Sequence, residues 1–193
     1  MGEDLARLWR ERHPSVPPVA HTFRTVFADR WVRFHSLPES KRHPESEDEY
    51  AIVLHRHNTV LDELFGEQEV FVVTSDWSST AGGPAGFPTP RRELHPDGVL
   101  WWTEPDLSGP DPGFHTYSRF YADRRPWRRG CVDDLLRAVA DEEIVDVFLT
   151  DTGLRRVHHP YDGGADAVLT TPAERDRLRA RHRDWLSRHP SGC

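Results

Sequence analysis

The chain has 193 residues, a formal net charge of −7 and only two cysteines, Cys131 and Cys193. This length can bury one hydrophobic core, so we expect a single domain over residues 1–193. The negative charge argues against nucleic acid as a partner, and the cysteines can form neither a metal cluster nor a disulfide framework. Because the sequence lacks a signal-peptide region and any run of roughly 20 apolar residues, it predicts a cytoplasmic protein without a membrane partner.

The first 18 residues are expected to precede the core of the domain, which spans residues 19–190. The segment Glu3–Arg12 places Leu5, Leu8 and Trp9 on one side of a short helix. Three prolines between residues 14 and 18 then form a stiff connector. The following segment, Val19–Phe27, is interpreted as a strand that leads into the next element.

A strand and a charged turn follow. In Trp31–His35, alternation places Val32 and Phe34 on one face and the polar residues on the other. Pro38 ends the strand, and residues 39–44 form a turn rich in charge. The turn leads directly into the longest helix that the sequence predicts.

This long helix is expected over residues 47–65. Ser46 and Glu49 have the spacing of a capping box, which satisfies the first backbone donors of a helix. Apolar side chains recur at intervals of three and four residues as far as Phe65, and Gly66 stands where a helix commonly ends. One face of the helix therefore belongs to the core.

The remainder of the chain alternates strands with two further helices. Short β-branched and aromatic runs predict the strands, which are Glu69–Thr74, Gly98–Thr103, Phe114–Tyr121, Glu143–Thr150, Leu154–His159 and Asp166–Leu169. Helices are predicted over residues 131–140 and 172–189, and residues 76–97 are predicted to form a long loop. This pattern indicates an α+β fold: a mostly antiparallel or mixed sheet of about five to seven strands, with two main helices packed on it. A parallel α/β fold is the second interpretation.

Lys41 is the single lysine among 25 basic residues. A retained lysine beside Ser40 and Arg42, shortly after Arg33 and His35, is consistent with an anion site in which an ammonium group is required. The alternative is a solvated turn, in which these cations pair with the acidic residues between positions 45 and 49. Charge clusters in turns are usually of the second kind.

Other polar residues also have two interpretations. His158, His159, Asp162 and Asp166 include metal-ligand types, but Asp162 before two glycines is more typical of a structural turn, and no second cluster has metal spacing. We therefore predict no metal site and no cofactor. His57 lies on the apolar face of its helix, where a core histidine is more common than a general base.

Basic residues surround Trp127 at positions 124–129, which is a pattern found in nucleic-acid contacts. Packing of this tryptophan in the core is the simpler interpretation, and it agrees with the negative net charge. The common nucleotide-binding, zinc-protease and hydrolase motifs do not occur in the sequence. Their absence disfavours those enzyme classes only.

Three ordered motifs, RFHSLPESKR at 33–42, RHNTVLDELF at 56–65 and HPYDGGADAVL at 159–169, are similar to those of an uncharacterised bacterial family of domains of unknown function. The resemblance extends from about Val19 onward and implies a small cytosolic bacterial protein, without a catalytic role to transfer. Its matching polar positions are the candidate ligand-binding residues: Arg33, His35, Ser40, Lys41, Arg42, Asn58, Tyr161, Asp162 and Asp166.

Two functions follow from these observations. The first is a binding or interaction protein, including the immunity-type partner of a toxin, which rests on the acidic charge, the missing catalytic motifs and the many tryptophans. The second is an enzyme or ligand-binder for a phosphorylated or carboxylated small molecule. In that case Arg33, Lys41 and Arg42 would bind the anion, and His35 and Lys41 would be the catalytic candidates. Convergence of the Lys41 turn and the Asp162–Asp166 segment would favour the second function.

Overall fold

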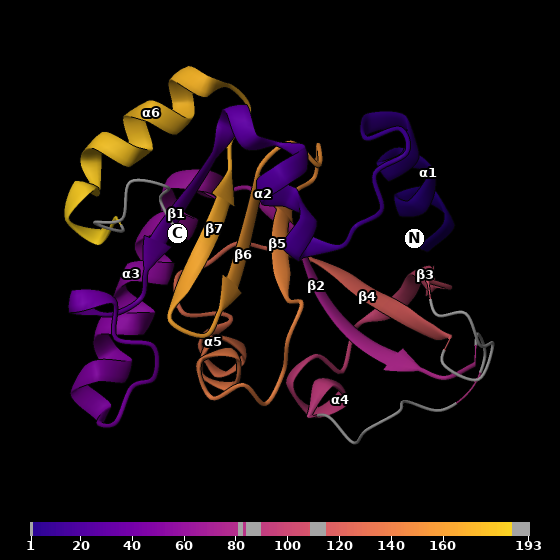
Figure 1. The fold of residues 1–193 in the computed structure, drawn as a ribbon, viewed down its shortest axis with the longest axis horizontal. Coiled ribbons are helices and arrows are strands. Elements are labelled where there is room, and N and C mark those ends of the chain that lie inside the picture. Colours follow the sequence, from indigo (N-terminus) through magenta and orange to yellow (C-terminus); the bar gives the residue numbers. More distant parts are fainter. Residues whose placement is uncertain (1, 81–82, 84–89, 109–114, 187–193) are drawn as a thin grey trace.

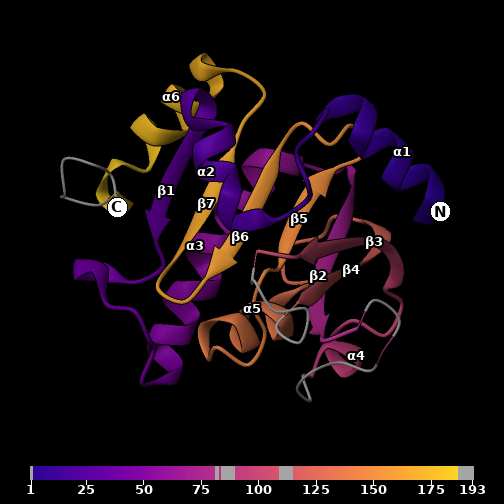
Figure 2. The same ribbon diagram turned by 45° about the vertical axis from the view of Figure 1, so that its right-hand side comes forward.

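The computed structural model describes residues 2–80, 83, 90–108 and 115–186. Its centre is a seven-stranded sheet in the order β1-β7-β6-β5-β2-β4-β3, and every neighbouring pair is antiparallel. The strands are β1 (Trp31–His35), β2 (Glu69–Ser78), β3 (Val99–Asp106), β4 (Thr116–Pro126), β5 (Phe148–Asp151), β6 (Val157–Tyr161) and β7 (Gly164–Val168). The sheet is twisted, so that β2 and β4 run at a steep angle to β6 and β7 (Figures 1 and 2).

Helices cover both faces of this sheet (Figure 1). They are α1 (Gly2–Arg12), α2 (Phe23–Val26), α3 (Glu47–Phe65), α4 (Arg91–Leu94), α5 (Asp133–Ala140) and α6 (Pro172–Arg181). The α+β class is thereby confirmed, whereas the parallel alternative is wrong. Among the described helices, none is long and apolar enough to cross a lipid bilayer.

Two apolar clusters hold the layers together, one on each side of the sheet. The first joins α3, α5 and α6 to Val32, Phe34 and other residues of the same sheet face. The second joins α1 and α2 to the opposite face, through large side chains such as Trp9 and Phe148. Strand residues alternate between the two clusters because successive side chains in a strand point to opposite faces. We call the second side the α2 face.

Four predicted elements need correction. The loop expected over residues 76–97 contains the end of β2 and the short helix α4. Val19–Phe27 is a 3₁₀ turn followed by α2, because Phe23 and Phe27, four residues apart, both pack into the second cluster. The strand predicted from Glu143 begins only at Phe148, since Asp146 has a left-handed backbone with a φ of 54°. The last helix ends at Arg181, with a 3₁₀ turn over Arg183–Trp185, and residues 187–189 lie outside the described part.

Candidate functional site

A cleft of about 390 Å³ opens on the α2 face, above β1, β7 and β6. Four of the residues selected from the sequence line it: Arg33, Tyr161, Asp162 and Asp166. The remaining walls come from the segment between α5 and β5 and from the 3₁₀ turn and helix at residues 20–26. The volume falls within the range of small-molecule sites, which is roughly 300–1,000 Å³.

The floor of the cleft is a row of side chains across three strands. Antiparallel pairing places Arg33 of β1 opposite Asp166 of β7, and Asp166 opposite His159 of β6. The Arg33 guanidinium donates two hydrogen bonds to Asp166, at 2.8 Å from Nε to Oδ1 and 3.1 Å from Nη2 to Oδ2. The Asp166 side chain is only 4% exposed. The two charges therefore neutralise each other in a site that water barely reaches.

Aromatic rings fix the position of this arginine. The Arg33 guanidinium carbon lies 5.3 Å from the centre of the Trp31 ring and 5.1 Å from the centre of the Tyr161 ring. Stacking on aromatic faces is a contact that guanidinium makes better than ammonium. Burial, together with the nearby Asp166 carboxylate, raises the pKa of Tyr161, which therefore keeps its hydroxyl proton at neutral pH.

His159 presents a hydrogen-bond acceptor to the cleft. Its Nδ1 lies 2.7 Å from the backbone oxygen of Val147. A carbonyl oxygen can only accept, so Nδ1 carries the proton and Nε2 has a free lone pair. Burial lowers the pKa of His159, which keeps the ring neutral. Nε2 makes no hydrogen bond with any residue that the structure describes.

Hydrogen-bond acceptors also outnumber donors at the rim of the cleft. Glu142, Asp146 and Asp162 contribute carboxylates, whereas Arg24 is the one rim arginine among the described lining residues. Arg42 reaches Asp162 from outside, with Nε 2.7 Å from Oδ2. Glu142 forms no ion pair with any described residue. The cleft therefore offers more acceptors than donors to a ligand.

The charged turn meets the β6–β7 hairpin through Arg42 and not through Lys41. Besides its bonds to Asp162, Arg42 packs on Gly163, where an added Cβ would lie 3.1 Å from the Arg42 Cα. Lys41 instead donates hydrogen bonds to Glu45 at 3.0 Å and Glu49 at 2.8 Å, and these bonds raise its pKa. Lys41 does not line the cleft. The two stretches thus converge, with the unique lysine turned toward its own acidic neighbours.

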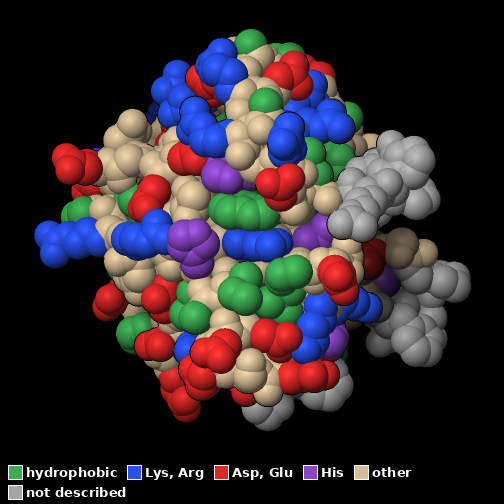
Figure 3. Space-filling view, turned by 90° about the vertical axis from the view of Figure 1, so that its left-hand side faces the viewer, with side chains coloured by type: hydrophobic (Ala, Val, Ile, Leu, Met, Phe, Trp, Pro, Cys, Tyr) green, Lys and Arg blue, Asp and Glu red, His purple; other side chains and the backbone are tan. Residues whose placement is uncertain are grey.

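Two other predicted residues, His35 and Ser40, line a separate groove of about 230 Å³ beside Arg56 and Trp185. The Arg56 guanidinium carbon lies 5.3 Å from the centre of the Trp185 ring, and its Nη1 donates to the His35 backbone oxygen at 2.8 Å. Figure 3 views the molecule from the side of α3 and α6 and shows hydrophobic side chains there, flanked by basic residues and histidines. His35 Nε2 is buried without a hydrogen-bond partner among the described residues.

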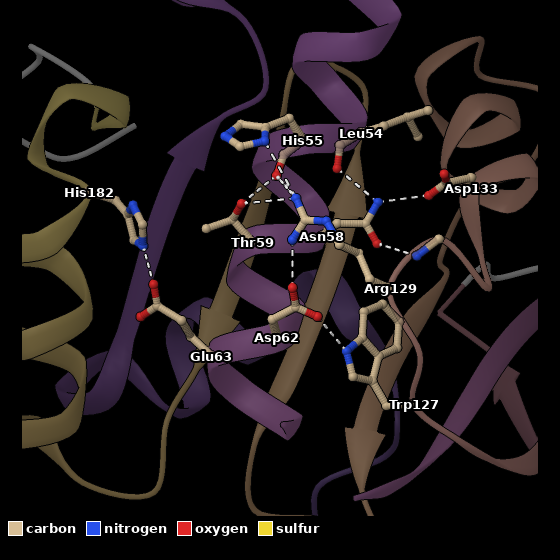
Figure 4. Close-up of polar contacts among 11 residues, drawn as sticks. Leu54, His55, Asn58, Thr59, Asp62, Glu63, Trp127, Arg129, Asp133 and His182 are labelled. Carbon is tan, nitrogen blue, oxygen red and sulfur yellow. Dashed lines mark hydrogen bonds and ion pairs between the residues drawn. The ribbon is translucent and has the colours of Figure 1, made fainter. Parts of the chain in front are cut away.

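Asn58 has a structural position and lines neither hollow. Its Nδ2 donates to the Leu54 backbone oxygen at 2.9 Å and to Asp133 at 2.7 Å, and its Oδ1 accepts from the Gly130 N–H at 3.0 Å (Figure 4). These bonds tie α3 to the beginning of α5. The segment around Trp127 is also held against α3, because Arg129 and the Trp127 indole both donate hydrogen bonds to Asp62 (Figure 4).

Two histidine networks lie inside the protein. His57 bridges Ser36, at 2.9 Å from Nε2, and His158, at 3.0 Å from Nδ1. Beneath α4, His95 contacts Thr74 at 2.8 Å and Asp123 at 2.9 Å, which resembles the order of groups in a hydrolase triad. Thr74 is 0% exposed and His95 is 1% exposed, so a substrate cannot reach the hydroxyl. We interpret both networks as core polar groups, in which His158 Nδ1 has no hydrogen-bond partner among the described residues.

Sequence reasoning missed several residues of the cleft. Arg24 and Glu142 lie outside the three motifs, and no local pattern marks them. His159 was considered only as a metal ligand. Alternation in its strand was the available signal, because it places His159 on the same face as Tyr161.

Comparison with known proteins identifies the family. The family model of DUF3885, a domain of unknown function, matches residues 19–190, which is most of the chain. No curated protein and no solved structure matches the chain. The resemblance to a domain of unknown function is thereby confirmed, and the chain belongs to the DUF3885 family.

Proposed function

We propose that the protein binds a small molecule rich in hydroxyl or amino groups, such as a sugar, a polyol or an amino sugar, in the cleft on the α2 face. The observation that carries the proposal is His159, a neutral imidazole whose Nε2 lone pair has no partner among the described residues and which lines a cleft of about 390 Å³. A ligand in the cleft can donate a hydrogen bond to this acceptor.

The rim supports the same class of ligand. Glu142, Asp146 and Asp162 accept hydrogen bonds, and a ligand with several donors can use them together. The anionic ligand expected from the sequence has weaker support, because Arg33, Lys41 and Arg42 each already have a carboxylate partner. An anion at those cations would have to displace these partners.

Thermal melting tests this proposal. The panel contains monosaccharides, polyols, amino sugars and their phosphorylated counterparts, each assayed in the presence of a chelator. A ligand at 100 times its Kd stabilises the folded state by about 2.7 kcal/mol, which is a visible rise in the melting temperature. We expect an unphosphorylated compound to give that rise. His159→Gln and, independently, the exposed Glu142→Gln should reduce it, whereas His55→Gln on the outside of α3 should retain it.

A rise confined to the phosphorylated compounds would favour the anionic alternative. If no compound shifts the wild-type midpoint, the cleft is not a site for this class. An unchanged rise in both cleft variants would place the ligand elsewhere on the protein.

A protein partner is the second candidate function, and the edge strand β3 is the observation that favours it. Val99 is 50% exposed and Leu100 is 46% exposed on a strand whose only partner among the described strands is β4. An open strand edge can accept a further strand from another protein. A partner captured from source-cell extract by the wild type, but not by Leu100→Glu, would support this function. Equal capture by both proteins would exclude the edge.

A further inference from the structure

The mouth of the cleft brings together three metal-ligand side chains from three separate parts of the chain. His43 belongs to the turn before α3, Glu142 to the segment after α5 and Asp162 to the β6–β7 hairpin. One ligand atom from each lies within 4.8 Å of the others. Sequence spacing could not reveal this group, because its members are separated by about a hundred and by twenty positions.

We propose that His43, Glu142 and Asp162 bind a divalent transition-metal ion, such as Zn²⁺, at the mouth of the cleft. An imidazole nitrogen with two carboxylate oxygens is a donor set that Zn²⁺ uses, and it suits Mg²⁺ less well because Mg²⁺ prefers oxygen ligands and retained water. Three protein ligands leave at least one coordination position for water or for a bound molecule.

The contacts of Asp162 agree with this role. Both Arg42 nitrogens hydrogen-bond the same oxygen, Oδ2, so that Oδ1 remains available as a ligand. Carboxylates that bind metals are commonly oriented by such a second hydrogen bond. The positive charge of Arg42 also offsets part of the negative charge at the site. This lowers the affinity of the site for a cation but leaves the metal-ligand atoms in place.

A second observation indicates that a ligand belongs here. His159 is 6% exposed, and its Nε2 has no hydrogen-bond partner among the described residues. It lines the same cleft as Glu142 and Asp162. Nε2 is not among the fully buried side-chain atoms without a partner, so it is open to the cleft, where a bound molecule or metal-held water can donate to it. A metal ion at the mouth, holding water or ligand hydroxyls toward the floor, would supply such a donor.

This inference does not rest on the proposed sugar or polyol ligand, although the two are compatible. Hydroxyl groups can occupy the open positions of a metal ion, while the ion compensates the negative charge of Glu142 and Asp162. Metal binding is therefore tested with the ion alone. The ligand panel is tested in a chelator, so that failure of one proposal leaves the other to be judged separately.

The experiment is calorimetric titration of Zn²⁺ into the full chain at neutral pH. All proteins carry Cys131→Ser and Cys193→Ser, because the exposed Cys131 thiol would bind the ion itself. The variants are His43→Gln and Glu142→Gln. The control is His55→Gln, which removes another exposed imidazole. Since all three side chains are exposed, the substitutions should leave the fold intact, which circular dichroism verifies.

The expected result is one Zn²⁺ per chain for the wild-type background and for His55→Gln. Both His43→Gln and Glu142→Gln should bind at least about tenfold more weakly, in line with the loss of a ligand. Mg²⁺ should bind more weakly than Zn²⁺ to the wild-type background. If that background takes up no stoichiometric Zn²⁺, or if His43→Gln binds as tightly as His55→Gln, the site does not exist.

Discussion

The pair formed by Arg33 and Asp166 shows how single residues define the cleft. The Arg33 side chain is 14% exposed and its partner 4% exposed, so water can solvate either charge only in part if the other is removed. We expect Asp166→Asn to destabilise the protein by about 3–5 kcal/mol, because it leaves an uncompensated buried guanidinium. Urea unfolding measures this change.

A matched control separates charge from packing at this pair. The double variant Arg33→Met, Asp166→Leu removes both charges, and we expect it to recover much of the lost stability, since an apolar pair can replace a buried ion pair. If Asp166→Asn unfolds within about 0.5 kcal/mol of the wild type, the pair is not a buried, mutually dependent unit.

The sequence alone is sufficient to identify some of the individual residues of the cleft. Arg33, Tyr161, Asp162 and Asp166 were selected from motifs and indeed share one cleft. Lys41 was selected because it is the only lysine, but rarity in a sequence carries no spatial information. Its side chain pairs with Glu45 and Glu49, which is the solvated-turn alternative. Whether a charge pairs locally or across the fold depends on side-chain directions that spacing does not fix.

The contact between α3 and α5 depends on Asn58. Its amide satisfies three backbone or side-chain groups, so Asn58→Ala leaves Asp133 and the Gly130 N–H without that partner. We expect a loss of about 1–3 kcal/mol, measured by urea unfolding. Thr59→Ala, on the neighbouring position of the same helix, is the control and should cost less. Equal losses of unfolding free energy in both variants would contradict the role of Asn58 in linking α3 to α5.

The N-terminus of α3 offers a smaller test. The Ser46 side chain accepts a hydrogen bond from the backbone N–H of Glu49. Ser46→Ala should therefore lower the free energy of unfolding by about 1 kcal/mol, whereas Ser46→Asp should preserve it, because aspartate also caps helices well. An unchanged midpoint in Ser46→Ala would show that the cap contributes little.

Elements were predictable where their cause is local. The limits of α3 follow from a capping box, a periodic apolar face and Gly66, and all three lie within the helix or directly beside it. The segment 19–27 was wrong because its conformation is decided by tertiary packing of Phe23 and Phe27. The late start of the strand expected from Glu143 reflects left-handed backbones at Glu142 and Asp146, and such conformations in residues other than glycine leave little trace in sequence.

For the whole molecule, buried histidines predict sensitivity to acid. Burial lowers the pKa of His57 to about 4, and the pKa of His158 is also lowered by burial. The unfolded chain binds these protons near the ordinary histidine pKa of 6.5, whereas the folded chain does not. The stability that these neutral histidines contribute is therefore fully present above pH 6.5, and it is lost as the pH falls toward 4.

By about pH 5, His57 alone should remove about 2 kcal/mol from the free energy of unfolding relative to neutral pH. Urea unfolding at several pH values measures this slope, and His57→Gln should reduce it. A free energy of unfolding that stays constant between about pH 7 and 5 would show that these histidines are protonated in the folded state or exposed to water.

The arrangement of the sheet gives the cleft its chemistry, because the order β1-β7-β6 brings Arg33, Asp166 and His159 side by side from distant parts of the chain. We propose that this cleft binds a small molecule rich in hydrogen-bond donors. The most direct measurement is ¹H–¹⁵N NMR of the ¹⁵N-labelled protein, titrated with the most stabilising sugar, polyol or amino sugar of the panel. If the ligand binds in the cleft, the shifted signals should cluster at Arg24, Arg33, residues 142–147 and residues 159–166. Shifts confined to the groove beside Arg56 and Trp185, or scattered over the surface, would contradict this proposal.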